Sequence, residues 1–197
     1  MPTILFESLS ETKKSLIIKA SIKEFSECSY ENASINSIIK EANISRGSFY
    51  QYFEDKEDLY IYIMTESFKK AFFLFESIIN NKSISIKDKI LGIFDKTISY
   101  GEDAKLFVKM IFNMKYAHHK ILIEEVEKIF KNKKDCLSEL KLNNNQTKAF
   151  FDLIFTSFGV ECFSVLTGKS SYEESRKLLQ LKIDIIKGGL KLKWLNY

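Results

Sequence analysis

Residues 44–59 read ISRGSFYQYFEDKEDL, and this stretch decides the fold. Four aromatic residues stand within five positions of it, directly behind Arg46, which is one of only two arginines in the chain. A helix that serves only a core has little use for two phenol hydroxyls one turn away from an arginine. The stretch therefore raises the question of what Tyr50 and Tyr52 contact.

Helical spacing divides this stretch between two faces. Phe49 and Phe53 are four residues apart and share a face with Ile44, so we expect them to point into a core. Gly47 has no side chain, which lets the backbone approach another surface closely. The residues left on the outer face are Arg46, Ser48, Tyr50, Gln51 and Tyr52.

Two short helices are predicted on either side of a turn at residues 43–45. Ser34 and Ser45 are suited to cap helices over 35–42 and 46–52. The turn between them is Asn43-Ile44-Ser45, and asparagine tolerates a left-handed backbone. Two short helices joined in this way describe a helix-turn-helix, whose second helix lies in the major groove of DNA.

Helices are also predicted on both sides of this motif. Ser8 and Glu11 have the spacing of a capping box and open a helix that ends near Cys28, with Ile18, Ile22 and Phe25 on its inner face. The chain has 7 glycines and 1 proline, which favours long helices over a sheet protein with many turns. Further helices are expected near 56–79, 85–100, 103–115, 118–140, 146–167 and 172–193. The predicted fold class is all-α.

Charge and composition limit the class of protein. The formal net charge is +4, but residues 1–56 carry seven bases and eight acids, so DNA binding must depend on placed residues rather than on bulk charge. Three distant cysteines suggest reduced, buried thiols. With no signal pattern and no membrane-length apolar run, we expect a cytoplasmic protein without a membrane partner.

Sequence motifs indicate neither an enzyme nor a metal or cofactor site. The chain contains no G-x-S-x-G, no H-E-x-x-H and no P-loop. His118 and His119 could be metal ligands, but adjacent histidines point apart on a helix, so a pair in a loop or at a helix start is favoured. We therefore expect no enzyme, no metal and no cofactor.

Residues of about 9–69 resemble the DNA-binding domain of the tetracycline-repressor (TetR) family. The resemblance rests on Y-x-x-A-S-I (30–35), I-I-K-E-A-N-I-S (38–45), G-S-F-Y (47–50), Y-F (52–53), Lys56 and Leu59. It covers about 60 residues, and it implies a DNA-binding domain over 1–56 with a ligand-binding and dimerisation domain over 57–197. In that second domain the chain matches the family only in the number and length of its helices.

The resemblance also implies a role for individual residues. Ser34, Tyr50, Tyr52 and Lys56 would contact phosphates, and Ser45 would cap the recognition helix near a phosphate. Base edges would be read by Arg46, Gly47, Ser48 and Gln51. Phosphate contacts set the register of a protein on DNA, and base contacts specify the sequence.

The sequence departs from the family pattern at four positions. Ser29 stands where a glycine usually ends the first helix, and Asn43 replaces a common glycine in the turn. Glu24 replaces a usual apolar residue. Ile39 replaces a small one, where extra bulk could shift the packing of the two helices.

The last two predicted helices have apolar residues on more than one face. A helix of this kind has two surfaces to bury, and the second suggests a two-fold homodimer, for which we name Phe163 and Ile186. The resemblance implies such a dimer as well, formed by a four-helix bundle of the last two helices of each chain. Its two recognition helices would bind a pseudo-palindromic operator in double-stranded DNA.

Phenylalanines beyond residue 60 either line a ligand cavity or fill the core. For any single residue the core is favoured, but a cavity would suit an unknown small apolar or aromatic ligand. The candidates for its wall are Phe94, Phe107, Phe112, Phe151, Phe155 and Phe158.

These observations predict an all-α, two-domain, homodimeric DNA-binding transcriptional regulator. We expect a repressor that is released by a small molecule bound in its C-terminal domain. The alternatives are a regulator without a ligand, an activator, a TetR-like scaffold that acts through protein contacts and, more remotely, a small all-α enzyme.

Overall fold

The computed structural model describes residues 2–115, 118, 120, 121, 124, 140 and 142–189 of the chain. Within these residues it contains nine helices and no strand, as the predicted fold class requires. The chain forms two compact units, Met1–Ala71 with Leu106–Leu122, and Phe72–Lys105 with Ile123–Tyr197. Each unit has buried apolar side chains of its own.

The helices agree closely with the predicted ones. The helices that contribute to the first unit are α1 (Ile4–Glu7), α2 (Glu11–Glu27), α3 (Ile35–Glu41), α4 (Arg46–Tyr52), α5 (Lys56–Ile79) and α7 (Glu102–Phe112), of which α5 and α7 continue into the second unit. The second unit also contains α6 (Ile86–Ser99), α9 (Asn144–Leu166) and α10 (Tyr172–Gly189). Most of the helix predicted over 118–140 and the end of the one predicted to 193 lie outside the described residues.

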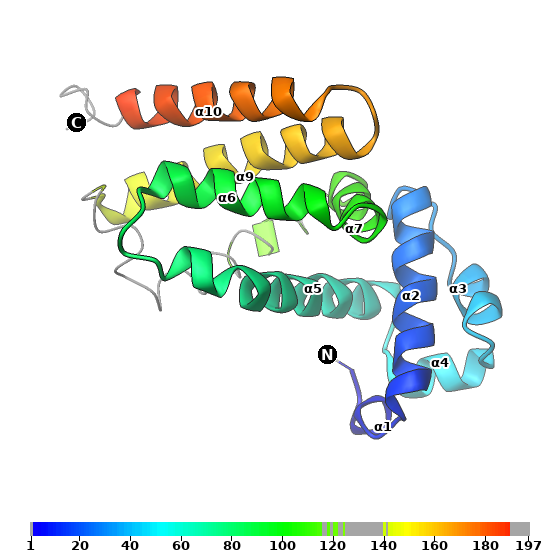
Figure 1. Ribbon diagram of the computed structural model, residues 1–197. Helices are drawn as coiled ribbons and strands as arrows, with labels where there is room; N and C mark the ends of the chain where they lie inside the picture. Colours follow the sequence, from blue (N-terminus) through cyan, green and yellow to red (C-terminus); the bar gives the residue numbers. More distant parts are fainter. Residues whose placement is uncertain are drawn as a thin grey trace. The chain divides into compact units, whose positions relative to one another are not determined.

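The first unit is built around aromatic side chains. In Figure 1, α3 and α4 lie beside α2, and α1 sits at the foot of α2 next to α4. The inner face of α2 is formed by Ile17, Ser21 and Phe25, whereas Ile18 and Ile22 are only half-buried, so the predicted face was displaced by one residue. The largest side chains with less than 2% exposure in this unit are Phe6, Ile17, Phe25, Ile38, Phe49, Phe53, Leu59, Tyr60, Ile63 and Met110.

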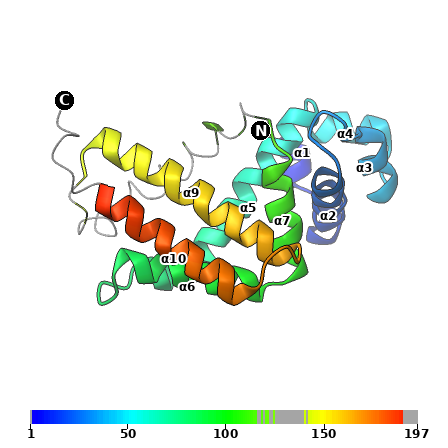
Figure 2. The same ribbon diagram turned by 90° about the horizontal axis from the view of Figure 1, so that it is seen from above.

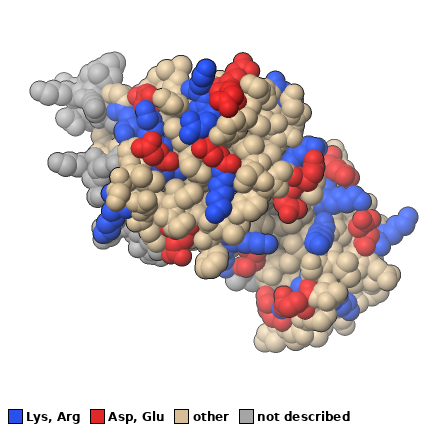
Figure 3. Space-filling model, in the orientation of Figure 1, with Lys and Arg blue, Asp and Glu red and all other residues tan. Residues whose placement is uncertain are grey.

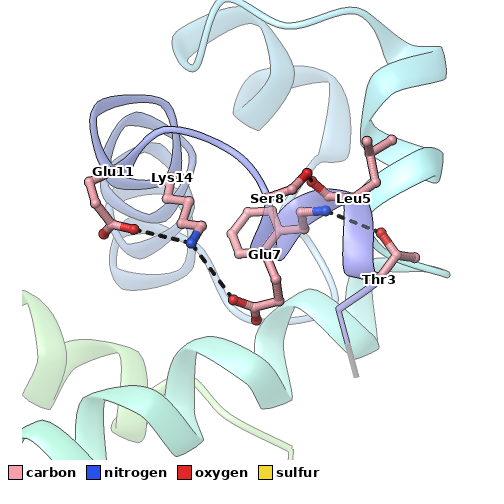
Figure 4. A network of polar contacts seen from close by, with 7 residues as sticks. Thr3, Leu5, Glu7, Ser8, Glu11 and Lys14 are labelled. Carbon is pink, nitrogen blue, oxygen red and sulfur yellow. Dashed lines mark hydrogen bonds and ion pairs between the residues drawn. The ribbon is translucent and has the colours of Figure 1, made fainter.

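Helix α1 was not predicted, and it changes how α2 begins. The predicted capping box from Ser8 is wrong: the N-cap of α2 is Ser10, whose side chain accepts a hydrogen bond from the Lys13 N–H. Ser8 instead ends α1 and donates its hydroxyl to the Leu5 carbonyl oxygen at 2.8 Å. Figure 4 shows the Ser8–Leu5 contact together with the ammonium group of Lys14, which lies 3.8 Å from Glu7 and 3.1 Å from Glu11.

The second unit has α6, α9 and α10 side by side in both views (Figures 1 and 2). Phe94, Phe150, Leu179 and Ile183 are fully or almost fully buried in it. Asp95 on α6 accepts two hydrogen bonds from the Arg176 guanidinium, at 2.9 and 3.1 Å, and these bonds join α6 to α10. Such a bidentate pair fixes both distance and orientation.

Helix α9 is long and apolar enough to cross a membrane by length and composition alone, a property that core helices also have. In this fold it packs along α6 and α10. Cys162 lies on it, fully buried, and burial raises the pKa of its thiol. Cys28 is half-buried, and Cys136 lies outside the described residues.

Candidate nucleic-acid interface

Helix α4 is held at its beginning by the turn that precedes it. Asn43 has a φ of 51°, so the predicted left-handed residue is confirmed. Ser45 is the N-cap, and its hydroxyl accepts a hydrogen bond from the Ser48 N–H at 3.0 Å, as predicted. This capping leaves the first residue of the helix, Arg46, on the surface.

The C-terminal end of α4 is held by residues close to the N-terminus. The Thr3 hydroxyl donates to the Gln51 carbonyl oxygen at 2.7 Å, and the Thr3 N–H donates to the Tyr52 carbonyl oxygen at 3.0 Å. These bonds satisfy carbonyl groups that the end of a helix leaves without partners. The ring of Phe6 lies 4.7 Å from that of Phe53, between centroids, and closes the core beneath the helix.

The aromatic residues of α4 divide almost as expected. Phe49 and Phe53 are fully buried, which confirms their predicted orientation. Tyr50 is 45% exposed and also points outward as predicted. The outward placement of Tyr52 was wrong, because only 5% of this residue is exposed.

Tyr52 is buried because α1 covers it. Its ring meets that of Phe6 edge-on, with centroids 6.0 Å apart, and the Lys13 ammonium lies 5.9 Å from its centroid. Sequence spacing on α4 alone places Tyr52 on the outer face, and α1 adds a surface there that spacing does not reveal. A phosphate contact through the Tyr52 hydroxyl stays a prediction.

The guanidinium of Arg46 is held by two neutral side chains. Its Nη1 donates to Asn36 Oδ1 at 2.8 Å, and its Nη2 donates to the Tyr50 hydroxyl at 3.3 Å. The guanidinium carbon also lies 5.6 Å from the centre of the Tyr50 ring, within the range of a cation–π contact. Arg46, Asn36 and Tyr50 are all exposed, so they form one outward-facing polar group that spans α3 and α4.

The start of α3 shows what the unusual Glu24 does. Glu24 Oε1 accepts a hydrogen bond from the Ser34 N–H at 2.8 Å, so the carboxylate caps the entry to α3 from α2. Ser34 is the N-cap residue as predicted, but its side chain makes no capping hydrogen bond. The Ser34 hydroxyl therefore does not cap α3.

Lys56 has a structural role that the sequence did not reveal. Its ammonium donates to the carbonyl oxygens of Tyr30, Glu31 and Ala33, at 2.7, 3.1 and 2.9 Å. An ammonium has three N–H donors, and these three bonds use all of them. The predicted phosphate contact of Lys56 is therefore not supported, because the residue instead fixes the turn that leads into α3.

The Tyr30 ring also contacts the Lys56 ammonium. Burial, with smaller contributions from the nearby acids, raises the pKa of Tyr30 to about 12, so its phenol stays neutral at ordinary pH. The Lys56 ammonium lies 4.7 Å from the centroid of this ring, and the Lys115 ammonium lies 4.5 Å from it.

The remaining predicted DNA contacts lie on the surface of α4. Gly47 and Gln51 are exposed, and Ser48 is half-buried with its hydroxyl 2.8 Å from that of Ser45. A Cβ atom added at Gly47 would meet only the Ser45 hydroxyl, at 3.8 Å, which is an ordinary contact. The fold itself thus gives no steric reason for a glycine at this position.

Charge is mixed on the one face of the protein for which it is displayed (Figure 3). On the face that Figure 3 displays, acidic and basic side chains are interspersed rather than gathered into a continuous basic stripe. This agrees with the balance of bases and acids in residues 1–56. With this balance, affinity of residues 1–56 for a polyanion depends on placed side chains such as Arg46.

The predicted ligand-lining residues are divided between the two units, and their role in a cavity stays a prediction. Phe94, Phe151, Phe155 and Phe158 belong to the second unit, where the rings of Phe94 and Phe158 lie 6.1 Å apart. Phe107 and Phe112 belong to the first unit; Phe107 lies 5.1 Å from the ring of Phe68, and Phe112 is 45% exposed. Spacing along the helices could not assign these residues to different units.

The predicted dimer residues are half-buried within the single chain. Phe163 and Ile186 are each partly covered by the rest of the chain. Other apolar side chains on the same two helices are more exposed. The large exposed apolar residues of α9 and α10 are Leu153, Val160, Leu178, Leu181 and Ile185. A dimer contact through Phe163 and Ile186 stays a prediction.

His118 is a core residue rather than a surface ligand. It is 3% exposed, and its Nε2 lies 3.0 Å from Glu57 Oε1. Among the described residues, no three His, Cys, Asp or Glu side chains are grouped so that they could hold a metal ion. His119 lies outside the described residues.

Comparison with known proteins assigns a class to this arrangement. The curated relatives include the HTH-type transcriptional regulator YdgC of Bacillus subtilis (strain 168), which is 31% identical over 105 residues, or 52% of this chain and 53% of that protein. They also include HbdR of Aromatoleum sp. (strain CIB), 45% identical over 51 residues, or 26% of this chain and 22% of that protein. The matched stretches span only 21% to 53% of the lengths of four such relatives. The matched part of the chain is thus similar to the DNA-binding domain of HTH-type transcriptional regulators.

The family follows from the same domain and from the fold. Residues 17–63 match the family described as bacterial regulatory proteins, tetR family. The structure of the transcriptional regulator FadR from Bacillus subtilis in complex with stearoyl-CoA has the same fold, with a TM-score of 0.67 at 17% identity over 89% of this chain and 98% of that chain. Residues 17–63 thus match the DNA-binding domain of the tetR family, and the chain as a whole shares the fold of the FadR structure.

The role found for Lys56 generates a prediction about stability. Lys56→Met removes the three donors to the 30–33 turn, so we expect the free energy of unfolding to fall by about 2 kcal/mol, the cost of losing hydrogen bonds from a charged group. Urea denaturation followed by circular dichroism measures this change. Lys40→Met, an exposed lysine on α3, is the control and should change stability little. Equal stability of the two variants would contradict the structural role.

Proposed function

We propose that the chain binds double-stranded DNA through the outer face of α4. In this proposal residues 1–56 form the DNA-binding part and residues 57–197 the regulatory part. Arg46, Gly47, Ser48 and Gln51 face base edges, while Ser34, Ser45 and Tyr50 contact phosphates. A protein that binds chromosomal DNA must be in the same compartment as the chromosome, so we propose that this protein is cytoplasmic.

The observation that carries this proposal is the exposed Gly47 between Arg46 and Tyr50. Glycine in a helix costs stability relative to alanine, and here the fold has room for a Cβ atom. A close approach of the backbone to another molecule would explain the glycine. Arg46 and Tyr50, which stand on either side of it, supply a cation and a hydroxyl suited to a polyanion.

Gly47→Ala separates folding from DNA binding. We expect the variant to be more stable by about 0.5 kcal/mol, because alanine favours the helix. Its duplex affinity should fall by about fivefold, the equivalent of one lost hydrogen bond, because the added methyl holds the helix away from the groove. Denaturation and a fluorescence titration with duplex DNA at several salt concentrations measure the two effects.

A matched control is available on α6. Gly92→Ala places a Cβ atom 3.6 Å from the nearest atom of Ile78, also an ordinary contact, and it should leave duplex affinity unchanged. If Gly47→Ala binds DNA as tightly as the wild type, α4 is not the contact surface. If the wild type shows no salt-dependent duplex binding at all, the DNA-binding function is wrong and a scaffold role takes its place.

The proposal includes a homodimer formed through α9 and α10. Leu178, Leu181 and Ile185 are three and four residues apart on α10 and lie on one exposed face, while Leu179 and Ile183 are buried on another. Large apolar side chains in a row gain free energy when a second copy covers them. A two-fold dimer would present two recognition helices to a pseudo-palindromic operator.

Charge placed on this exposed face should dissociate the dimer without unfolding the chain. Leu181→Glu and Ile185→Glu alter side chains that are 55% and 64% exposed in the single chain, so the monomer should keep its melting temperature at low concentration. Each substitution should weaken association by about 2 kcal/mol or more, since a buried apolar side chain contributes about that much. Sedimentation equilibrium measures the change. Gln180→Glu, an exposed control on the same helix, should remain dimeric, and dimeric Leu181→Glu and Ile185→Glu variants would contradict this interface.

The finer role that we propose is repression relieved by an apolar ligand in the second unit. Its interior is rich in aromatic side chains, with Phe94 and Phe151 buried and Phe158 close to Phe94. The FadR structure from Bacillus subtilis contains stearoyl-CoA, which makes a long acyl chain the first ligand to test. A ligand can release DNA only through a difference in its affinity for the two conformations.

Stearoyl-CoA titrated into the protein–DNA complex checks this role. We expect the duplex affinity to fall at saturating ligand, by about tenfold for a coupling free energy of 1.4 kcal/mol. Free coenzyme A is the control for the polar part of the ligand and should release no DNA. DNA binding that is insensitive to stearoyl-CoA would contradict an acyl ligand while leaving the DNA-binding proposal intact.

A further inference from the structure

The guanidinium of Arg46 is anchored across two helices in an unusual way. Asn36 is the second residue of α3, and Arg46 is the first residue of α4. The 2.8 Å bond from Arg46 Nη1 to Asn36 Oδ1 therefore bridges the two helices of the helix-turn-helix, whereas the 3.3 Å bond to Tyr50 stays within α4. The side chain is fixed from both directions before any DNA is present.

Both of these partners are electrically neutral, which sets Arg46 apart from the other arginine of the chain. Arg176 is paired with the Asp95 carboxylate through two hydrogen bonds. No ion pair among the described residues includes Arg46. Its positive charge is thus held in place without being neutralised.

Counting donors shows that the anchored guanidinium can still bind a base. A guanidinium has five N–H donors, and the two bonds to Asn36 and Tyr50 use one on each terminal nitrogen. One N–H remains on each of the three nitrogens. Two of these are enough for the bidentate contact with O6 and N7 of guanine.

We propose that Asn36 is a positioning residue for DNA-sequence discrimination and acts through Arg46. This inference rests on the proposed DNA-binding function. A free arginine loses rotamer entropy when it binds a base, and an arginine already held in one orientation loses less. Asn36 thereby raises the penalty for a wrong base pair, because the anchored fork cannot swing to an alternative acceptor.

The choice of asparagine over aspartate follows from the same reasoning. A carboxylate at position 36 would hold Arg46 equally well, but it would neutralise the charge and repel nearby phosphates. The amide supplies an acceptor without a charge. Asn36→Asp and Asn36→Ala therefore separate the effect of orientation from the effect of charge.

Nuclear magnetic resonance tests the anchoring without DNA. Because the chain has only two arginines, the side-chain nitrogen signals of Arg46 and Arg176 are easily distinguished. We expect hindered rotation of the Arg46 guanidinium in the wild type and in Asn36→Ala at least about fivefold faster rotation, the equivalent of one lost hydrogen bond. Arg176, held by Asp95, is the internal reference and should not change. Equal rotation rates of Arg46 in the wild type and in Asn36→Ala would overturn the proposal.

Selection from a randomised operator library tests the consequence for DNA. Arg46→Lys should relax one base pair per half-site, because lysine lacks the planar fork. Asn36→Ala should relax the same base pair by about fivefold while changing non-specific affinity little, since the charge is kept. Adding Asn36→Ala to Arg46→Lys should cause no further loss of discrimination at that base pair. Asn36→Asp should instead weaken binding to all sequences.

The possible outcomes distinguish the inference from the function on which it rests. A wild type without any sequence preference would contradict the proposed function. A selective wild type with an equally selective Asn36→Ala variant would overturn only the role of Asn36. A loss at a different base pair, additive with Arg46→Lys, would show that Asn36 reads DNA itself and would also overturn the positioning role. Ser37→Ala, an exposed neighbour on α3, controls for changes in the helix.

Discussion

The burial of Phe49 and Phe53 is the constraint on which the first unit depends. Helix α4 has seven residues, and an isolated helix of fewer than about 12 residues is not stable in water. Its conformation therefore comes from the core into which these two rings pack, and from the bonds of Ser45 and Thr3 at its ends. Everything on the outer face of α4, including Arg46 and Gly47, takes its position from this inner face.

The charged side chains around α4 fall into two groups. The charged groups of Lys56 and Glu24 form hydrogen bonds with backbone groups, and these bonds fix the 30–33 turn and the entry to α3. Arg46, in contrast, is held by the neutral Asn36 and Tyr50. The fold thus uses some charges to define its shape and leaves one on the surface, oriented but not neutralised. This division agrees with a surface that lacks a continuous basic patch on the face shown in Figure 3 and depends on individual residues.

Much of the candidate site was predictable because local rules govern it. Capping by Ser45, the left-handed Asn43 and the inward orientation of Phe49 and Phe53 each depend on residues within a few positions of one another. The errors came from contacts between distant parts of the chain. Tyr52 is covered by α1, and Lys56 reaches carbonyl groups 23 to 26 residues earlier. No periodicity along α4 or α5 carries that information.

The sequence by itself determined the class of fold, the boundaries of most helices in the described residues and the resemblance of the N-terminal domain to the tetR family. These follow from helix periodicity, capping residues and the register of apolar and aromatic positions, all of which act over short distances. Only the tertiary structure decided which polar groups serve the fold and which remain at the surface, as Lys56 and Arg46 show. The physical reason is that a long cationic side chain binds whichever acceptors the packing of distant helices brings within about 3 Å, and the geometry of that packing is not written in any one stretch of the chain.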